Sequence, residues 1–135
     1  MISTRENNKI VFRDVVLNGH RVAEKSFPVY KLGNFETFYY GRMLGSELNM
    51  TFLKANNNDF TALRWRLPTL KELRYMIEFS RGYGVLDFIF DNFNYSHHWI
   101  SYGIELGYYD MSNGVYGYAN NKLLMTFETR FVRAI

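Results

Sequence analysis

The sequence of 135 residues contains no cysteine and only two prolines, Pro28 and Pro68. Without cysteine the chain can form no disulfide, no thiolate metal site and no thiol nucleophile. The net charge is only +3, from 16 basic and 13 acidic residues, and no two basic residues are adjacent. A nucleic-acid-binding protein usually carries a denser basic stripe, so nucleic acid is not an expected partner.

Long hydrophobic runs are also missing. No apolar stretch approaches the roughly 20 residues needed to span a bilayer, so we expect no membrane insertion. Residues 1–8 are polar and lack the apolar segment of a signal peptide. We therefore expect the chain in the cytoplasm or in an assembled particle such as a virion, rather than on the classical secretory route.

Aromatic residues are in excess, since they make up 19% of the chain and include 11 tyrosines. The hydrophobic share of 47% and the charged share of 21% are typical of a globular domain. We expect a flexible segment at 1–8 and a single domain at 9–135, which is long enough to bury a core. So many tyrosines favour interface positions, where the ring packs and the hydroxyl stays in water.

The first half of the chain predicts a hairpin and a helix. Two β-prone runs at 9–17 and 20–30 are separated by Asn18-Gly19, the strongest short hairpin signal. Pro28 should limit the second strand, at a sheet edge or a bulge. Asn34 can cap a helix through Leu48, because apolar residues recur at roughly helical spacing, although Gly41 and Gly45 weaken this prediction.

A second helix is predicted after Pro68. Thr69 is its N-cap, and Glu72 three residues later completes a capping box. Four residues form the apolar stripe of this helix, which should end at Gly82 or Gly84: Leu70, Leu73, Met76 and Ile77.

The last third is β-like. Turn signals at 112–114 and 120–121 separate short aromatic runs. We predict strands at 97–102, 104–111, 115–119, 122–127 and 130–135. The fold class is therefore α+β, with two helices followed by a C-terminal antiparallel β-meander.

Three segments together resemble a known family. Residues 65–73 read W-R-L-P-T-L-K-E-L, residues 99–101 read W-I-S, and the chain closes with V-R-A-I. This order, over about residues 60–135, resembles the C-type-lectin-like C-terminal domain of collagen-like bacterial adhesins, which is related to the formylglycine-generating (sulfatase-modifying) enzymes. The resemblance implies a C-type-lectin-like fold whose C-terminal strands display the binding face.

The best-known chemistries of that superfamily are not expected in this chain. Its enzyme branch uses a cysteine pair to bind copper, and no cysteine is present. Calcium-dependent lectins use a Glu-Pro-Asn or Gln-Pro-Asp type loop and a Trp-Asn-Asp segment, whereas here Ile100 follows Trp99 and neither proline lies in such a loop. The polar run at 56–59 is the sole calcium candidate, and we interpret it as a solvated loop. We expect no metal and no cofactor.

A catalytic site is not recognisable either. The chain has no Gly-x-Ser-x-Gly elbow and no glycine-rich phosphate loop. His97 and His98 form the only histidine cluster, but neighbours on a strand point to opposite faces, so they cannot easily bind one metal. The alternative that stays open is an enzyme-like cytosolic protein with a cryptic site near these histidines and Asp110.

The candidate binding residues are five tyrosines interleaved with glycine and asparagine: Tyr102, Tyr108, Tyr109, Tyr116 and Tyr118. Tyrosine rings in such sequences add contact area at a low cost in entropy, as in antibody loops. We therefore expect a non-catalytic interaction or structural module that binds a protein or a glycan through these residues. A homo-oligomer or a larger virion or surface assembly is consistent with the aromatic excess.

Basic residues around the second helix have a plainer interpretation. Lys71, Arg74 and Glu78 should form its solvated face. If Arg66 were buried, it would need a carboxylate partner such as Asp110 or Glu128 and would be structural.

Overall fold

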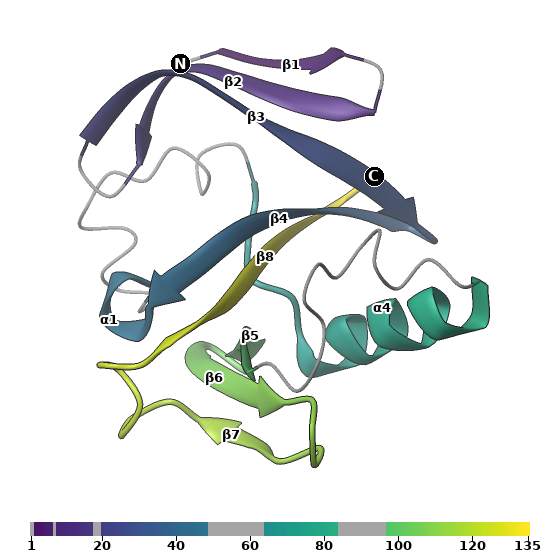
Figure 1. Cartoon of the computed structure of the whole chain (residues 1–135), viewed down its shortest axis with the longest axis vertical. Coiled ribbons are helices and arrows are strands. Elements are labelled where there is room, and N and C mark those ends of the chain that lie inside the picture. Colours follow the sequence, from purple (N-terminus) through teal and green to yellow (C-terminus); the bar gives the residue numbers. More distant parts are fainter. Residues whose placement is uncertain (1, 7, 18–19, 49–63, 84–96) are drawn as a thin grey trace.

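The computed structural model describes residues 2–6, 8–17, 20–48, 64–83 and 97–135. These residues form a mostly-sheet α+β protein with an eight-stranded mixed sheet in the order β1-β2-β3-β4-β8-β5-β6-β7 (Figure 1). The described part contains two helices, α1 (Gly45–Leu48) and α4 (Leu70–Tyr83). The predicted α+β class is confirmed at this level.

The N-terminal strands agree with the hairpin prediction. Strand β2 (Lys9–Leu17) pairs antiparallel with β3 (His20–Leu32), and Leu17 lies opposite His20. The Asn18-Gly19 turn itself lies outside the described residues. Residues 1–8, expected to be flexible, contain strand β1 (Ile2–Glu6), which pairs antiparallel with β2.

Strand β3 changes its partner at Pro28. Its first part pairs with β2 as far as Pro28, and from Val29 onward it pairs with β4 (Phe35–Leu44). Proline lacks the N–H that a ladder needs, so it stands where one pairing ends and the next begins. Pro28 therefore does not end the strand, which continues to Leu32.

The predicted helix at 34–48 is wrong over residues 35–44, and only its last four residues are helical, as α1. Gly33, at a φ of 63°, and Asn34 form the turn of a second hairpin, in which Leu32 lies opposite Phe35. Residues 35–44 are strand β4, with a bulge between Tyr39 and Gly41, where Gly41 has a φ of 126°. The apolar spacing looked helical because β4 is buried on both faces at its start, which hides the alternation of a strand.

The prediction for residues 65–83 is confirmed. Trp65 and Leu67 are buried and Arg66 is exposed. The backbone of Arg66 bonds that of Val132 in both directions, at N–O distances of 3.0 and 2.7 Å. Helix α4 includes Gly82 and ends at Tyr83; Gly84 lies outside the described residues.

The capping box has the expected geometry. The backbone N–H of Thr69 donates to Glu72 Oε1 at 2.9 Å, and the Glu72 N–H donates to Thr69 Oγ1 at 3.2 Å. Arg66 adds two bonds to the Glu72 carboxylate, at 2.7 and 2.9 Å. Arg66 is thus paired with Glu72, and neither Asp110 nor Glu128 is its partner. Burial by itself raises the pKa of Glu72, but the bonds from Arg66 and Thr69 outweigh it and hold the pKa below the ordinary value of 4.5.

Glu72→Gln is expected to lower the unfolding free energy at pH 7 by about 1 kcal/mol, because the charge-assisted bonds are lost. A carboxylate whose pKa is lowered on folding stabilises above its unfolded pKa and loses that effect as pH falls through its folded pKa. In urea denaturation series the difference between wild type and variant should therefore decrease as the pH falls below 4.5 and disappear below the lowered folded pKa. Glu78→Gln, an exposed carboxylate on the same helix, is the control, and equal pH curves for both variants would contradict the prediction.

The C-terminal strands form only part of the predicted meander. Strands β5 (His97–Tyr102), β6 (Glu105–Asp110) and β7 (Tyr116–Tyr118) are consecutive and antiparallel. The predicted strand at 122–127 is wrong, because residues 122–125 form a turn before strand β8 (Thr126–Ala134).

Strand β8 does not follow β7 in the sheet. It lies between β4, with which it pairs antiparallel over nearly its full length, and β5, with which it pairs in parallel (Figure 1). The three residues of β7 could not cover nine residues of β8, whereas the ten residues of β4 match them. The sheet is therefore mixed.

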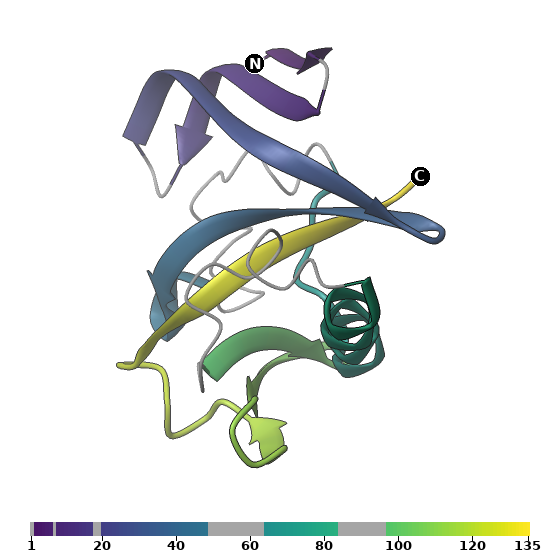
Figure 2. The same ribbon diagram turned by 45° about the vertical axis from the view of Figure 1, so that its right-hand side comes forward.

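The two faces of the central strands are covered by different layers. On one face, the N-terminal strands pack through Ile10, Phe12 and Phe27 onto a core that contains Phe38, Trp65, Trp99 and Phe131. On the other face, α4 packs through Leu73, Met76 and Ile77 onto Ile100 and Val132. Figure 2 shows the N-terminal strands and α4 on opposite sides of β4 and β8.

Candidate functional site

The sheet register divides the five predicted tyrosines between two faces. Tyr109 lies opposite Tyr116, and Gly107 lies opposite Tyr118, so both β7 tyrosines share a face with Tyr109. Tyr102 lies opposite Glu105 on that same face. Tyr108 points to the other face. We call the group of Tyr102, Tyr109, Tyr116, Tyr118 and the adjoining Arg74 the tyrosine face.

Three rings of the tyrosine face, those of Tyr116, Tyr102 and Tyr118, form a continuous series of contacts. The ring centroids of Tyr102 and Tyr118 are 4.7 Å apart, and those of Tyr102 and Tyr116 are 5.9 Å apart, both in edge-to-face arrangements. Edge-to-face pairs are favourable and fix the rings relative to one another. Tyr116 and Tyr118 are nevertheless 43% and 53% exposed, so two large rings are held in place while much of their surface contacts solvent.

Arg74 of helix α4 completes the tyrosine face. Its guanidinium carbon lies 5.3 Å from the ring centroid of Tyr116 and 5.8 Å from that of Tyr109. Within the described part of the chain Arg74 forms no salt bridge, and its side-chain interactions there are the cation–π contacts with these two rings. Parallel pairing of Thr69 with Ser101 ties the start of α4 to β5 and fixes this approach (Figure 1).

Gly107 makes the ring series possible. A Cβ atom at this position would lie 2.6 Å from the Cβ of Tyr102 and 2.9 Å from the carbonyl oxygen of Gly117. Neither atom is the end of a flexible side chain. Because glycine has no side chain, there is room at this position for the Tyr102 side chain to reach the ring of Tyr118.

Gly107→Ala is expected to displace Tyr102 from Tyr118 and to destabilise the protein by about 1–3 kcal/mol through overpacking. Near-ultraviolet circular dichroism of the tyrosines and thermal unfolding measure the two effects. Gly117→Ala is the matched control, because a Cβ there would lie at an ordinary 3.8 Å from the nearest atom, in the ring of Tyr108. Equal effects of both substitutions would contradict this account.

Tyr108 belongs to the opposite face. It packs partly buried against the core that contains Trp99, and the Lys122 ammonium lies 4.9 Å from its ring centroid. The sequence reasoning grouped Tyr108 with the other four, because alternation is ambiguous where two tyrosines are adjacent. Tyr108 therefore packs at the edge of the core and is not part of the tyrosine face.

The two histidines point to opposite sides of β5, as adjacent strand residues must. His98 is buried, whereas His97 is partly exposed, with its Nε2 atom 3.3 Å from Asp110 Oδ2. The His97 ring stacks on Phe127 with centroids 4.7 Å apart. Hydrogen bonds from Ser112, together with the smaller effect of His97, hold the pKa of Asp110 below its ordinary value.

A cavity of about 330 Å³ adjoins His97. Its wall carries charges of both signs, since Arg42 and Lys122 face it together with Glu128. Glu128 is engaged by Arg42 at 3.4 Å and by the hydroxyl of Tyr39. Burial and this carboxylate raise the pKa of Tyr39 to about 12. Among the described residues, no group of three or more histidine, aspartate and glutamate side chains is placed to hold a metal ion.

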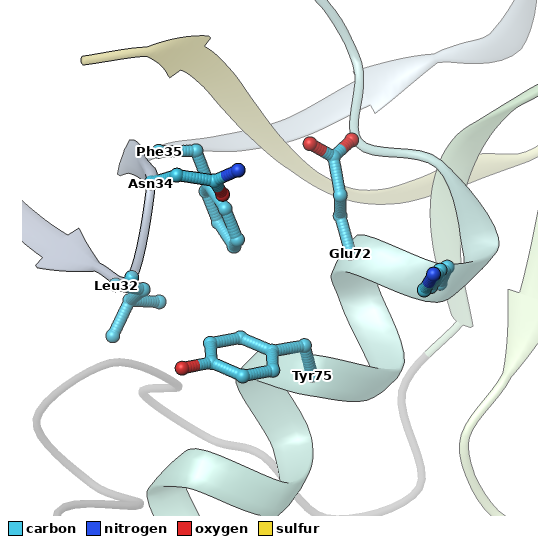
Figure 3. A pocket seen from close by; sticks show the side chains of 7 residues that line it. Leu32, Asn34, Phe35, Glu72 and Tyr75 are labelled. Carbon is cyan, nitrogen blue, oxygen red and sulfur yellow. The ribbon is translucent and has the colours of Figure 1, made fainter.

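A larger cavity of about 480 Å³ lies between the β3–β4 turn and α4. Figure 3 shows the ring of Tyr75 on one side, Leu32 and Phe35 across from it, and the Glu72 carboxylate at the rim. That carboxylate is already bound by Arg66 and Thr69. Lys71 and Asn34 add further polar groups, so the wall selects neither a cation nor an anion.

Sequence reasoning missed Arg74 as a functional residue. It was placed correctly on the exposed face of α4, together with Lys71 and Glu78. Its position over Tyr109 and Tyr116 depends on how α4 packs against β5, and no local sequence signal reports that packing. The polar run at 56–59, considered above as a loop, lies outside the described residues.

No helix of the described part is both long enough and apolar enough to cross a membrane. Comparisons with protein-family models, with curated proteins and with solved structures found no match to this chain. The candidate function therefore depends on the geometry of the tyrosine face and of the His97 cavity.

Proposed function

We propose that this chain is a non-catalytic interaction module with a C-type-lectin-like fold, which binds a glycan or protein partner through the tyrosine face. The observation that carries the proposal is the placement of four tyrosines from three strands and one arginine from helix α4 on a single face. Rings fixed by mutual contact but half exposed lose little freedom when a partner covers them.

The motif residues support the fold part of the proposal. The W-R-L-P-T segment meets the closing V-R-A-I segment through Arg66 and Val132, and it meets the W-I-S segment through Thr69 and Ser101. The Ser101 N–H also donates to the Pro68 carbonyl at 2.8 Å. The three segments that carry the family resemblance thus form one scaffold beneath the tyrosine face.

The partner in this proposal includes a second copy of the chain or another subunit of a virion or surface assembly. The face lies at the edge of the sheet, because β7 is the last of the described strands in the order. Other exposed apolar residues lie in nearby turns, namely Ile104 between β5 and β6 and Val115 before β7. Exposed aromatic and apolar groups near a sheet edge favour assembly.

Tyr116→Ala and Tyr118→Ala are expected to reduce partner binding at least tenfold without unfolding the protein, because truncation of a central interface aromatic typically costs that much. A glycan array and size-exclusion chromatography with light scattering are the two assays. Tyr75→Ala is the matched control, since Tyr75 is 44% exposed but lies on α4 away from the face. Loss of binding in the Tyr75 variant alone would overturn the proposal.

A second candidate is an enzyme-like site at His97. The observation that favours it is the contact of His97 with Asp110 beside a cavity, an arrangement that can orient an imidazole as a general base. The test is turnover of hydrolase substrate panels by wild type and His97→Gln. Activity that the substitution abolishes, with unchanged stability, would favour this candidate over the non-catalytic module.

A further inference from the structure

We propose that the ligand of the tyrosine face is an acidic sugar, whose carboxylate binds Arg74 and whose apolar ring face packs on Tyr116 and Tyr118. This inference rests on the proposed function and narrows it to one chemical class.

Arg74 is a positioned cation, and among the described residues no group accepts a hydrogen bond from its guanidinium. Its guanidinium lies against the rings of Tyr109 and Tyr116, at 5.8 and 5.3 Å from their centroids. A cation–π contact of this kind holds a guanidinium beside the rings without using its N–H donors. Within the described residues no carboxylate binds Arg74, although Glu78 lies one helical turn away. A planar fork of donors matches a carboxylate through two parallel bonds.

The exposed rings adjoin this cation and are suited to a sugar. A pyranose presents C–H groups on one face, and these pack on the negative face of an aromatic ring. Tyr116 contacts both Arg74 and Tyr102, and Tyr102 contacts Tyr118. A sugar ring over Tyr116 therefore places a ring substituent within reach of Arg74, and the next sugar reaches Tyr118.

The dimensions of the face favour an oligosaccharide over a protein epitope. Three adjacent strands span about 10 Å, and two alternate residues of β7 are about 7 Å apart, so the platform covers about 70 Å². A stable protein interface buries about 800 Å² on each partner, an order of magnitude more. The platform therefore matches one or two sugar rings.

The distribution of charge fixes the orientation and disfavours nucleic acid. Glu105 lies opposite Tyr102 at the end of the face away from Arg74, where it repels an anion. A single positioned arginine suits one carboxylate, whereas a nucleic-acid strand needs a groove with several phosphate contacts. We therefore expect the acidic group to lie toward α4 and the uncharged part of the sugar over Tyr118.

The test uses oligogalacturonate and sialyllactose as acidic probes, with their methyl esters as neutral counterparts, in isothermal titration calorimetry. Wild type should bind at least one acid about tenfold more tightly than its ester, and Arg74→Gln should remove that difference. Tyr116→Ala should weaken acid and ester alike. Lys71→Gln, an exposed cation one turn earlier on α4, is the control and should change neither.

The outcomes separate this inference from the proposed function. Equal binding of acid and ester, insensitive to Arg74→Gln, would overturn the acidic-sugar inference and leave a neutral glycan module. Absence of binding to every sugar would also overturn it. In that case, if Tyr116→Ala abolishes binding to a protein partner or self-association, the proposed function still holds. If Tyr116→Ala changes neither kind of binding, both the proposed function and the acidic-sugar inference are overturned.

Discussion

Replacement of Glu36 by glutamine is expected to destabilise the protein by about 2–3 kcal/mol. The Glu36 side chain is only 5% exposed, and it joins three strands that are far apart in the sequence. Arg133 of β8 donates to Glu36 Oε1 through Nε and Nη2, at 3.0 and 2.7 Å. Arg5 of β1 donates to the other carboxylate oxygen.

The size of this effect follows from the two arginines that remain. Glutamine keeps the volume of the side chain but leaves two guanidinium groups without their shared anion, and Arg133 also lies 4.3 Å from the centroid of the buried Trp65 ring. Removing one member of a buried ion pair typically costs 3–5 kcal/mol, and partial exposure of the arginines, at 36% and 24%, reduces this.

Urea denaturation monitored by fluorescence measures the change for Glu36→Gln. Glu105→Gln is the control, because Glu105 is exposed and its substitution should alter stability by less than about 0.5 kcal/mol. A double-mutant cycle with Arg133→Met should give a coupling free energy above about 1 kcal/mol. If Glu36→Gln and Glu105→Gln have the same urea midpoint, the ionic cluster contributes nothing measurable to stability.

Gly45→Ala is expected to destabilise the protein by about 3 kcal/mol, at the upper end of the range for overpacked cores. A Cβ atom at Gly45 would lie 2.7 and 2.8 Å from two atoms of the Trp99 ring and 3.1 Å from the Cα of Leu123. The Trp99 ring cannot retreat, since it is fully buried and its Nε1 donates to the Met43 carbonyl at 2.8 Å. Phe127 packs against it, with centroids 4.4 Å apart.

Thermal unfolding of Gly45→Ala checks this prediction. Combination with Trp99→Phe provides the decisive comparison, because phenylalanine lacks the two ring atoms that the new methyl group meets. The double variant should be more stable than the sum of the two single effects predicts. Additive effects would mean that the loss arises elsewhere, for instance in the backbone of α1.

Local signals in the sequence are sufficient to define several elements of the fold. Thr69 and Glu72 specify the start of α4, because the capping box satisfies amides within four residues of each other. The hairpin of β2 and β3 and the strand at 97–102 follow likewise from turn chemistry and β-prone runs. The interleaving with glycine and asparagine named all five candidate tyrosines, and the strand register places four of them on one face.

Tertiary structure decided what depends on contacts between distant segments. Residues 35–44 form a strand because β3 and β8 offer pairing partners on both sides, which outweighs an apolar spacing that also fits a helix. Strand β8 lies between β4 and β5 because its length matches β4 and not β7.

The candidate site shows the same division. Composition names the tyrosines, but the β5–β6–β7 register places Tyr108 on one face and the other four on the opposite face. The packing of α4 then places Arg74 over Tyr109 and Tyr116. The sequence of 135 residues gives the identity of each side chain. Which side chains come into contact depends on strand pairing and helix packing, because both are set by the free energy of the whole core.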